Sequence, residues 1–226
     1  MYKINKNYNR LLNGDSTFFL NPLEVMELKG KLNKNEYKIY MPTNDAEKVI
    51  FYKSNEPDIS LYEIKTNNEL RHQEILGSLF GLTIDESMFG DVIIDNGHYY
   101  VFIFNLIEDY FISNFNKIGK YNITLKKLDK NYLKDYERKY KEIEIIVTSL
   151  RIDTIISRII KCNRDSIKDK IKDKEILLNY DFLKNNSYKL KEGDIFSIRR
   201  FGKYKFIKIL NTTKKDNYIV LIHKYI

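Results

Sequence analysis

The side chains whose types and spacing could do chemistry are basic, and they recur at helical intervals in the C-terminal third of the chain. In "NRDSIKDKIKDK", Arg164, Lys168 and Lys172 follow one another at intervals of four residues, so one helix face would carry all three. Arg151 and Arg158 in "SLRIDTIISRI" are seven residues apart and would share a different helix face. Guanidinium and ammonium groups spaced along a surface neutralise the phosphates of a nucleic acid. The spacing therefore favours phosphate binding, although similar stripes also occur on ordinary solvated helices.

The excess positive charge of the chain lies in the same region. The 226 residues have a formal net charge of +8. Residues 144–210 contain 16 Lys and Arg against 9 Asp and Glu, a net charge of +7, whereas residues 1–142 contain 20 against 21. Residues 211–226 add 3 against 1. A local excess of this kind is typical of a surface that binds a polyanion, most simply a nucleic acid.

Basic residues also accompany a predicted β-hairpin, "GDIFSIRRFGKYKFIKIL", which has Gly202 at or near its turn. Lys203 and Lys205 alternate with aromatic residues, so both lysines would lie on one face of the strand. Together with the helical stripes they would form a positive platform for the phosphates of a nucleic acid. The candidate nucleic-acid-binding residues are Arg151, Arg158, Asn163, Arg164, Lys168, Lys172, Asn179, Arg199, Arg200, Lys203 and Lys205.

Polar residues near these positions suggest supporting roles. Asn163 precedes the second predicted helix and suits an N-cap. Asn179 ends a predicted strand, where it would either donate a hydrogen bond to RNA or hold the adjoining loop. Asp153 would orient Arg151 or cap the first helix, and Asp194 would shape the turn before its strand.

The sequence provides no constellation for catalysis. His72, His98 and His223 are far apart and lack metal-ligand spacing. The single cysteine, Cys162, excludes an internal disulfide framework and a cysteine-based zinc cluster, and we expect it to be a buried or half-buried structural thiol. "GSLFG" lacks the Gly-Lys-Ser/Thr ending of a phosphate-binding loop. We therefore expect no enzymatic activity, no metal and no cofactor.

Two short amphipathic helices must position the basic stripes. The first is predicted by isoleucines at i, i+3, i+4, i+7 and i+8, namely Ile152, Ile155, Ile156, Ile159 and Ile160. In the second, Ile167 and Ile171 would face inward. "EILLNYDFL" predicts a strand and a turn, which with the hairpin above would complete a small antiparallel sheet beneath the helices.

The remainder of the chain predicts mixed helical and strand structure. Strands are predicted for "YKIYM", "KVIFYKS" and "DISLYEIKT". "NPLEVMELKGKL" predicts a helix with Leu23, Met26 and Leu28 toward the core. "ELRHQEILGSLFG" predicts another helix, and Thr83 and Glu86 after it have capping-box spacing.

A hairpin and a further helix are predicted in the middle of the chain. "GDVIIDNGHYYVFIF" would turn at Asn96-Gly97. "YNITLKKL" predicts a strand, and "DKNYLKDYERKYKE" is either a linker or a surface strand pair. "NLIEDYFISNFNKIG" predicts a helix whose buried side would contain Leu106, Ile107, Tyr110, Phe111 and Phe115.

These elements indicate an α+β fold in three parts. We expect a small N-terminal α/β domain at residues 1–68, a central domain at 69–143 and a C-terminal domain at 144–226 with two basic helices on a small antiparallel sheet. No apolar run approaches the roughly 20 residues needed to span a bilayer, and the N-terminus lacks the apolar core of a signal peptide. We therefore expect a cytoplasmic monomer with no membrane partner.

Residues 148–206 resemble the small RNA-binding domain first named from a small-subunit ribosomal protein, called the S-four domain below. The resemblance rests on "SLRIDTIISRI", "NRDSIKDKIKDKEILLN" and "LKEGDIFSIRRFGKY", which follow the order and spacing of the family. The sequence departs at Ile152, Asn163 and Lys203, where the family more often has Leu, Ser and Arg. The resemblance implies that this segment binds structured RNA.

The middle segment, "HQEILGSLFGLTIDESMFGDVII", is similar to a pattern in the bacterial YlmH-type RNA-binding proteins, with departures at Gln73, Glu74, Thr83 and Glu86. With an S-four domain at its C-terminus, the whole chain resembles this family. The resemblance implies a central α/β sandwich like an RNA-recognition motif. It also implies association with rRNA and tRNA on the large ribosomal subunit and, for some members, a role in rescue of stalled translation.

Two alternatives to a non-enzymatic RNA-binding protein stay open. S-four domains are also attached to RNA-modifying enzymes such as pseudouridine synthases, and "RID" at Arg151 to Asp153 superficially resembles part of their catalytic motif. Its helical setting and basic neighbours fit the start of an S-four domain better. The other alternative is a cell-division-linked scaffold, because genes of this family often neighbour cell-division genes.

Overall fold

The chain forms two compact units, the first ending at Glu137 and the second running from Arg138 to Ile226. The computed structural model describes residues 2–33 and 36–226. Each unit combines helices with antiparallel sheets, which confirms the predicted α+β class. Within those described residues, no helix is both long enough and apolar enough to cross a bilayer.

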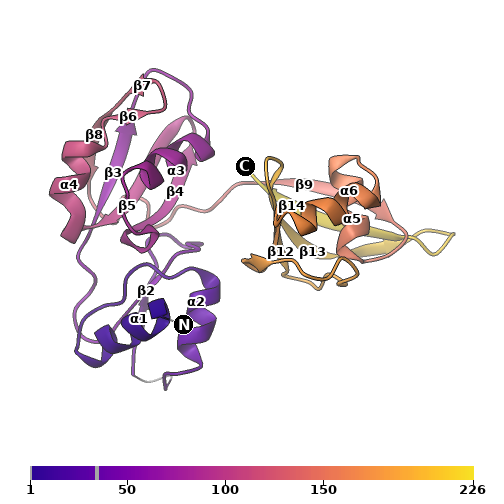
Figure 1. Ribbon diagram of the computed structural model, residues 1–226, viewed down its shortest axis with the longest axis horizontal. Helices are drawn as coiled ribbons and strands as arrows, with labels where there is room; N and C mark the ends of the chain where they lie inside the picture. The colour runs from indigo at the N-terminus through magenta and orange to yellow at the C-terminus, as the bar shows by residue number, and fades with distance from the viewer. Residues whose placement is uncertain (1, 34–35) are drawn as a thin grey trace. The chain divides into compact units, whose positions relative to one another are not determined.

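The first unit begins with two helices and a two-stranded sheet (Figure 1). β1 (Lys38–Tyr40) pairs with β2 (Ile50–Tyr52), as the strand patterns predicted. α1 (Tyr2–Leu12), a helix not predicted from the sequence, shares a core with α2 (Pro22–Lys29) and β2.

The helix α2 confirms one sequence prediction and contradicts part of another. It begins at a capping box, in which the Glu24 N–H donates to Asn21 at 3.0 Å and the Asn21 N–H donates to Glu24 at 2.9 Å. Leu28 is buried as predicted, but Met26 is 73% exposed and its predicted core position is wrong. The face of α2 that meets the core is therefore narrower than the apolar pattern suggests.

A four-stranded antiparallel sheet forms the rest of the first unit. Its order is β4-β5-β3-β8, with the strands β3 (Ile59–Lys65), β4 (Phe89–Asp95), β5 (His98–Phe104) and β8 (Thr124–Leu128). β3, which lies before the predicted boundary at residue 68, pairs with β5 and β8, which lie after it. The division into domains 1–68, 69–143 and 144–226 stays a prediction.

Both faces of this sheet are covered. α3 (His72–Gly81) and α4 (Glu108–Asn114) pack on one face in a core that includes Ile75 and Phe111. The other face meets Phe18 and Phe19, from the segment between α1 and α2. A short hairpin of β6 (Lys117–Ile118) and β7 (Tyr121–Asn122) follows α4.

The hairpin between β4 and β5 forms as predicted. Asp95 pairs with His98, and the two residues between them, Asn96 and Gly97, have φ angles of 50° and 81°. A two-residue turn with both φ angles positive matches the right-handed twist of the strands. The Asn-Gly signal therefore located this turn correctly.

The predicted capping box at Thr83 is wrong. Asp85 instead accepts a hydrogen bond from the Ser87 N–H at 2.9 Å, at the start of the short 3₁₀-helix η1 (Glu86–Met88). Two core positions predicted for the next helix are also wrong, since Leu106 is 76% exposed and Tyr110 47%. A 3₁₀ turn, η2 (Asn105–Ile107), precedes α4 and shifts the phase of the helix.

The second unit is a six-stranded antiparallel sheet with two helices on one face (Figure 1). α5 (Ile152–Ile160) and α6 (Arg164–Lys172) lie side by side, as predicted. The strand order is β11-β10-β12-β13-β14-β9, with the strands β9 (Tyr140–Val147), β10 (Ile176–Leu178), β11 (Asp181–Phe182), β12 (Ile195–Ile198), β13 (Gly202–Thr212) and β14 (Tyr218–Tyr225). Residues 129–139, before β9, form turns and an extended connection rather than a strand pair.

The core of the second unit lies between the helices and this sheet. Ile155 and Ile167 are fully buried and belong to one cluster with Phe196, Phe206 and Ile222 of the sheet. Because the isoleucine faces of both helices point inward, their Arg- and Lys-rich faces point outward. The hydrophobic pattern thus fixes which side of the second unit is positively charged.

Candidate nucleic-acid interface

The charge of the chain divides unequally between its two units. Residues 138–226 contain 22 Lys and Arg against 11 Asp and Glu, a net charge of +11, and residues 1–137 contain 17 against 20, a net charge of −3. The second unit therefore carries more positive charge than the whole chain. Electrostatic attraction to a polyanion would act on this unit first.

At the start of α5, a buried carboxylate holds an arginine. Asp153 has a side chain only 3% exposed, and it accepts hydrogen bonds from Arg151 Nε at 3.1 Å and Arg151 Nη2 at 2.7 Å. Burial raises the pKa of Asp153, but the hydrogen bonds and charge of Arg151 bring it below its ordinary value. The predicted role of Asp153 in orienting Arg151 is thus confirmed, and the Arg151 side chain stays 36% exposed.

The first turn of α6 joins the same site. Arg164 Nη2 donates a hydrogen bond to the Thr154 hydroxyl, and that hydroxyl donates to Asp153 Oδ1 at 3.2 Å. Asn163 caps α6 as predicted, since its Oδ1 accepts the Ser166 N–H at 2.8 Å. The cap fixes where α6 begins, and hence where Arg164 meets α5.

Lys168 lies one turn further along α6. It forms an exposed ion pair with Asp165 at 2.8 Å, and this hydrogen bond raises the pKa of Lys168. The charges of Asp153 and Arg151 also act on its pKa, in opposite directions, so Lys168 is near both. Arg151, Arg164 and Lys168 therefore gather around one buried carboxylate, and these four residues are called the Asp153 cluster.

A second group of cations surrounds Glu175, after α6. Lys170 Nζ contacts Glu175 Oε2 at 2.7 Å, and this hydrogen bond lowers the pKa of Glu175, with further lowering from the charges of Arg199 and Arg200. These four residues are called the Glu175 cluster. Lys170 was not among the predicted residues, because it lies off the Arg164–Lys168 stripe and only a tertiary contact brings it to the turn between β12 and β13.

The remaining predicted cations lie elsewhere. Arg158 lines a hollow of about 370 Å³ with Lys161 and Cys162, beside the end of β9. Lys172 is exposed at the end of α6. Lys203 and Lys205 lie on the opposite side of the sheet from the helices, since they alternate with buried residues beneath α5 and α6. The structure thus distributes the predicted residues over several surfaces rather than one platform.

Asn179 and Asp194 hold a loop of the second unit together. Asn179 Nδ2 donates to Asp194 Oδ1 at 2.8 Å, and its Oδ1 accepts the Ile195 N–H at 2.9 Å. Asp194 also accepts from the Tyr188 hydroxyl at 3.1 Å and the Lys191 N–H at 2.8 Å. Of the two roles considered for Asn179, the geometry supports the structural one, and Asp194 shapes its turn as predicted.

The other candidate groups belong to separate environments. His98 Nδ1 is 2.8 Å from Glu63, and His223 Nε2 is 3.4 Å from Glu142. Cys162 is half-buried, and burial raises the pKa of its thiol. Across residues 2–33 and 36–226, no group of three or more His, Cys, Asp or Glu residues is placed to hold a metal ion.

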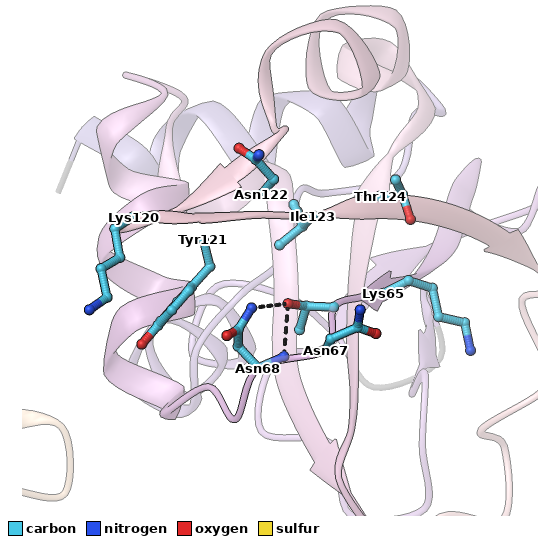
Figure 2. A pocket seen from close by; sticks show the side chains of 9 residues that line it. Lys65, Asn67, Asn68, Lys120, Tyr121, Asn122, Ile123 and Thr124 are labelled. Atoms are coloured by element: carbon cyan, nitrogen blue, oxygen red, sulfur yellow. Dashed lines mark hydrogen bonds between the residues drawn. The ribbon is translucent and has the colours of Figure 1, made fainter.

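A polar pocket of about 460 Å³ opens in the first unit (Figure 2). It lies between the loop after β3 and the segment from Lys120 to Thr124. Figure 2 shows Lys65 and Lys120 at the two sides of the pocket. The backbone N–H and the side-chain amide of Asn68 both donate hydrogen bonds to Thr66 Oγ1. Its lining of amides and hydroxyls includes no paired nucleophile and base.

Sequence comparisons with known proteins support a YlmH-type RNA-binding protein. A family described as "Putative RNA-binding domain in YlmH" matches residues 53–132. The chain is 25% identical over 224 residues to the "Ribosome-associated protein quality control protein P2" of Bacillus subtilis (strain 168), covering 92% of this chain and 86% of that protein. The solved structure of "Cell division protein ylmH from Streptococcus pneumoniae" aligns with a TM-score of 0.47 and 22% identity, covering 59% of this chain and 92% of that one. The family match ends at residue 132, before the second unit begins at Arg138. The assignment of the second unit as an S-four domain therefore stays a prediction.

Proposed function

We propose that this protein is a non-enzymatic RNA-binding protein that associates with rRNA and tRNA on the large ribosomal subunit. It would act in translation or in rescue of stalled ribosomes, as a cytoplasmic monomer, by holding a ribosomal complex in one state. The matched family is described as RNA-binding, and the Bacillus subtilis relative is named for ribosome-associated quality control. Both descriptions support the proposal.

The observation that carries the proposal is the Asp153 cluster. Arg151 and Arg164 are held by hydrogen bonds to Asp153 and Thr154 rather than left free to rotate. An oriented guanidinium loses less conformational entropy when it binds a phosphate, and it presents paired N–H groups to the phosphate oxygens. With Lys168 beside them, these groups would contact the backbone of a structured RNA, with the S-four fold as their support.

Sedimentation with purified ribosomal subunits tests this proposal. The wild-type protein should pellet with the large subunit at low salt, and the Arg164→Glu/Lys168→Glu variant should not. Lys214→Glu/Lys215→Glu is a matched control, because it changes the net charge equally at an exposed turn between β13 and β14. If two phosphate contacts are lost, the slope of log affinity against log salt should fall by about 2.

The outcomes separate the alternatives. Failure of the wild-type protein to pellet at low salt would exclude the ribosomal proposal and favour a scaffold or another RNA target. If Arg164→Glu/Lys168→Glu and Lys214→Glu/Lys215→Glu lost ribosome binding equally, net charge rather than the Asp153 cluster would govern binding. Lys168→Glu alone is the single variant least expected to disturb folding, because the Lys168 side chain is exposed and its ion-pair partner Asp165 is exposed too.

A further inference from the structure

The face of the six-stranded sheet opposite α5 and α6 has an unusual composition. Antiparallel partners share a face, and alternate residues of a strand return to it. Lys205 pairs with His223, and His223 pairs with Glu142. By alternation this face also includes Lys203, Tyr225 and Tyr140. It is called the open face, and its residues are Tyr140, Glu142, Glu144, Lys203, Lys205, His223 and Tyr225.

Rings and cations alternate across the open face. Lys203 Nζ lies 4.5 Å from the ring centre of Tyr180 and 5.2 Å from that of Tyr225. Arg138 Cζ also lies 5.3 Å from the ring centre of Tyr225. The Tyr140 ring meets Tyr225 edge-on, with centroids 5.1 Å apart. Each cation is therefore within the distance at which a ring quadrupole attracts it.

The aromatic side chains of the open face extend across β9 and β14. The rings of Tyr140 and His223 are 5.2 Å apart, with an angle of 34° between their planes. All of these side chains are partly exposed rather than buried, in contrast to Tyr204 and Phe206 on the helix-covered face. The open face thus combines partly exposed aromatic side chains with positive charges packed beside them.

Backbone strain at Tyr180 provides a separate observation. Tyr180 has a φ of 71° and follows Asn179, with a φ of 48°, in the two-residue turn between β10 and β11. Such turns usually have glycine at the second position, since a bulky residue is strained there. Strain that persists in a folded protein often marks a functional position. Here the strained turn places an aromatic ring against Lys203.

We propose that the open face binds unpaired nucleotides of RNA, by stacking bases on its tyrosines and contacting phosphates through Lys203 and Arg138. Aromatic rings beside basic side chains are the general means of binding single strands, because every base has a π face. Bases in a duplex are already stacked and cannot use such a surface. The proposal deepens the RNA binding proposed above, by adding a surface for single strands to the Asp153 cluster.

Two acidic residues, Glu142 and Glu144, alternate along β9 on this face and limit where the phosphates would lie. Glu142 carries a negative charge beside His223, at 3.4 Å. Phosphates would be repelled there, so the backbone of the strand is expected to follow the side of the face with Tyr180, Lys203 and Tyr225. Its bases would then point toward the adjoining rings of Tyr225 and Tyr140. The net charge of +11 on residues 138–226 matches a polyanionic partner.

Fluorescence anisotropy with a labelled oligouridine of about ten nucleotides, beside a blunt RNA duplex, tests the proposal. Tyr225→Ala and Tyr140→Ala should each weaken oligouridine binding at least about fivefold and leave duplex binding unchanged. Tyr225→Phe is the matched control and should retain binding, because it keeps the ring. Arg164→Glu/Lys168→Glu should show the opposite pattern, with duplex binding lost and oligouridine binding kept.

A spectroscopic test does not depend on the stability of the alanine variants. The chain contains no tryptophan, so Tyr225→Trp introduces a single indole reporter on the open face. Stacking of uridine should quench its fluorescence as oligouridine saturates the protein. Absence of quenching, or equal losses in Tyr225→Phe and Tyr225→Ala, would overturn the proposal. If ribosome pelleting fails while these tests succeed, the ribosomal function is wrong and the single-strand surface stands.

Discussion

Arg151 donates two hydrogen bonds to the buried carboxylate of Asp153, two residues further along the chain, at 3.1 and 2.7 Å. The pair spans the start of α5 and orients a half-exposed guanidinium toward solvent. Asp153 also accepts from the Thr154 hydroxyl, which itself accepts from Arg164. One carboxylate thus organises cations from two helices, and it is the natural target for a first substitution.

Asp153→Asn should destabilise the second unit by about 1–3 kcal/mol, because a buried carboxylate that accepts charged hydrogen bonds is replaced by a neutral amide. It should also weaken RNA binding, since Arg151 loses its fixed orientation. Urea denaturation followed by circular dichroism measures the first effect. Asp169→Asn, at an exposed position of α6, is the control and should leave the free energy of unfolding nearly unchanged. An unchanged denaturation midpoint for Asp153→Asn would contradict this account.

Glu108 makes a pH-dependent contribution to the stability of the first unit. Burial raises its pKa, but hydrogen bonds from Lys127 and Tyr62 help to lower it to about 2, from an ordinary value of 4.5. A carboxyl whose pKa is lower in the folded state stabilises that state fully above its unfolded pKa, and this contribution is lost as pH falls through the folded pKa. The stability difference between wild type and Glu108→Gln should therefore be constant from neutral pH to about pH 5 and shrink as pH falls toward 2.

Denaturation of both proteins across that pH range tests the prediction. Asp109→Asn is a suitable control, because Asp109 is the neighbouring exposed acid on α4. A stability difference that grows as the pH falls would show that the carboxyl of Glu108 is not the group responsible.

Arg200 offers a substitution that separates stability from binding. Its φ is 69°, a conformation that glycine adopts without steric cost. Arg200→Gly should leave the stability of the second unit unchanged or raise it by up to about 1 kcal/mol, while RNA affinity falls. Arg199→Gly removes the same charge without relief of a positive φ, and should cost about 0.5–1 kcal/mol. Thermal melts and binding titrations of both variants would distinguish the two effects. If Arg200→Gly lost as much stability as Arg199→Gly, the positive φ of Arg200 would not be a source of strain.

Gly90 lies where two parts of the first unit approach closely. A Cβ at this position would be 2.9 Å from Phe19 Cε1 and 3.1 Å from Phe102 Cβ. Gly90→Ala should therefore destabilise the first unit by about 1–3 kcal/mol. Gly77→Ala, in α3, meets nothing within 4 Å and should stabilise by about 0.5–1 kcal/mol. Binding by the second unit should be the same in both variants, and equal melting temperatures would show that Phe19 can move aside.

Predictions that depended on local pattern mostly agree with the structure. The helix pair of the second unit, the Asn163 cap and the Asn96-Gly97 turn each follow from short-range geometry, and each is confirmed. The errors arose where tertiary packing changed a local pattern. Met26 and Leu106 are apolar residues that the fold leaves exposed. α1 has a sequence rich in Asn and Lys, but Ile4, Tyr8 and Leu11 recur at helical spacing and face the core, a signal that was overlooked.

The α+β class, the two basic helices and the concentration of positive charge in the C-terminal segment can all be read from the amino-acid sequence. These follow from periodicity and composition, which act between residues close in the chain. Which of the cations lie close together depends on the folded chain. It joined Arg151, Arg164 and Lys168 around Asp153, brought Lys170 to the turn that contains Arg199 and Arg200, and placed Lys203 between two tyrosine rings on the opposite side of the sheet. Such groupings depend on strand order and register, which bring together residues that are distant in the sequence and cannot be read from local spacing.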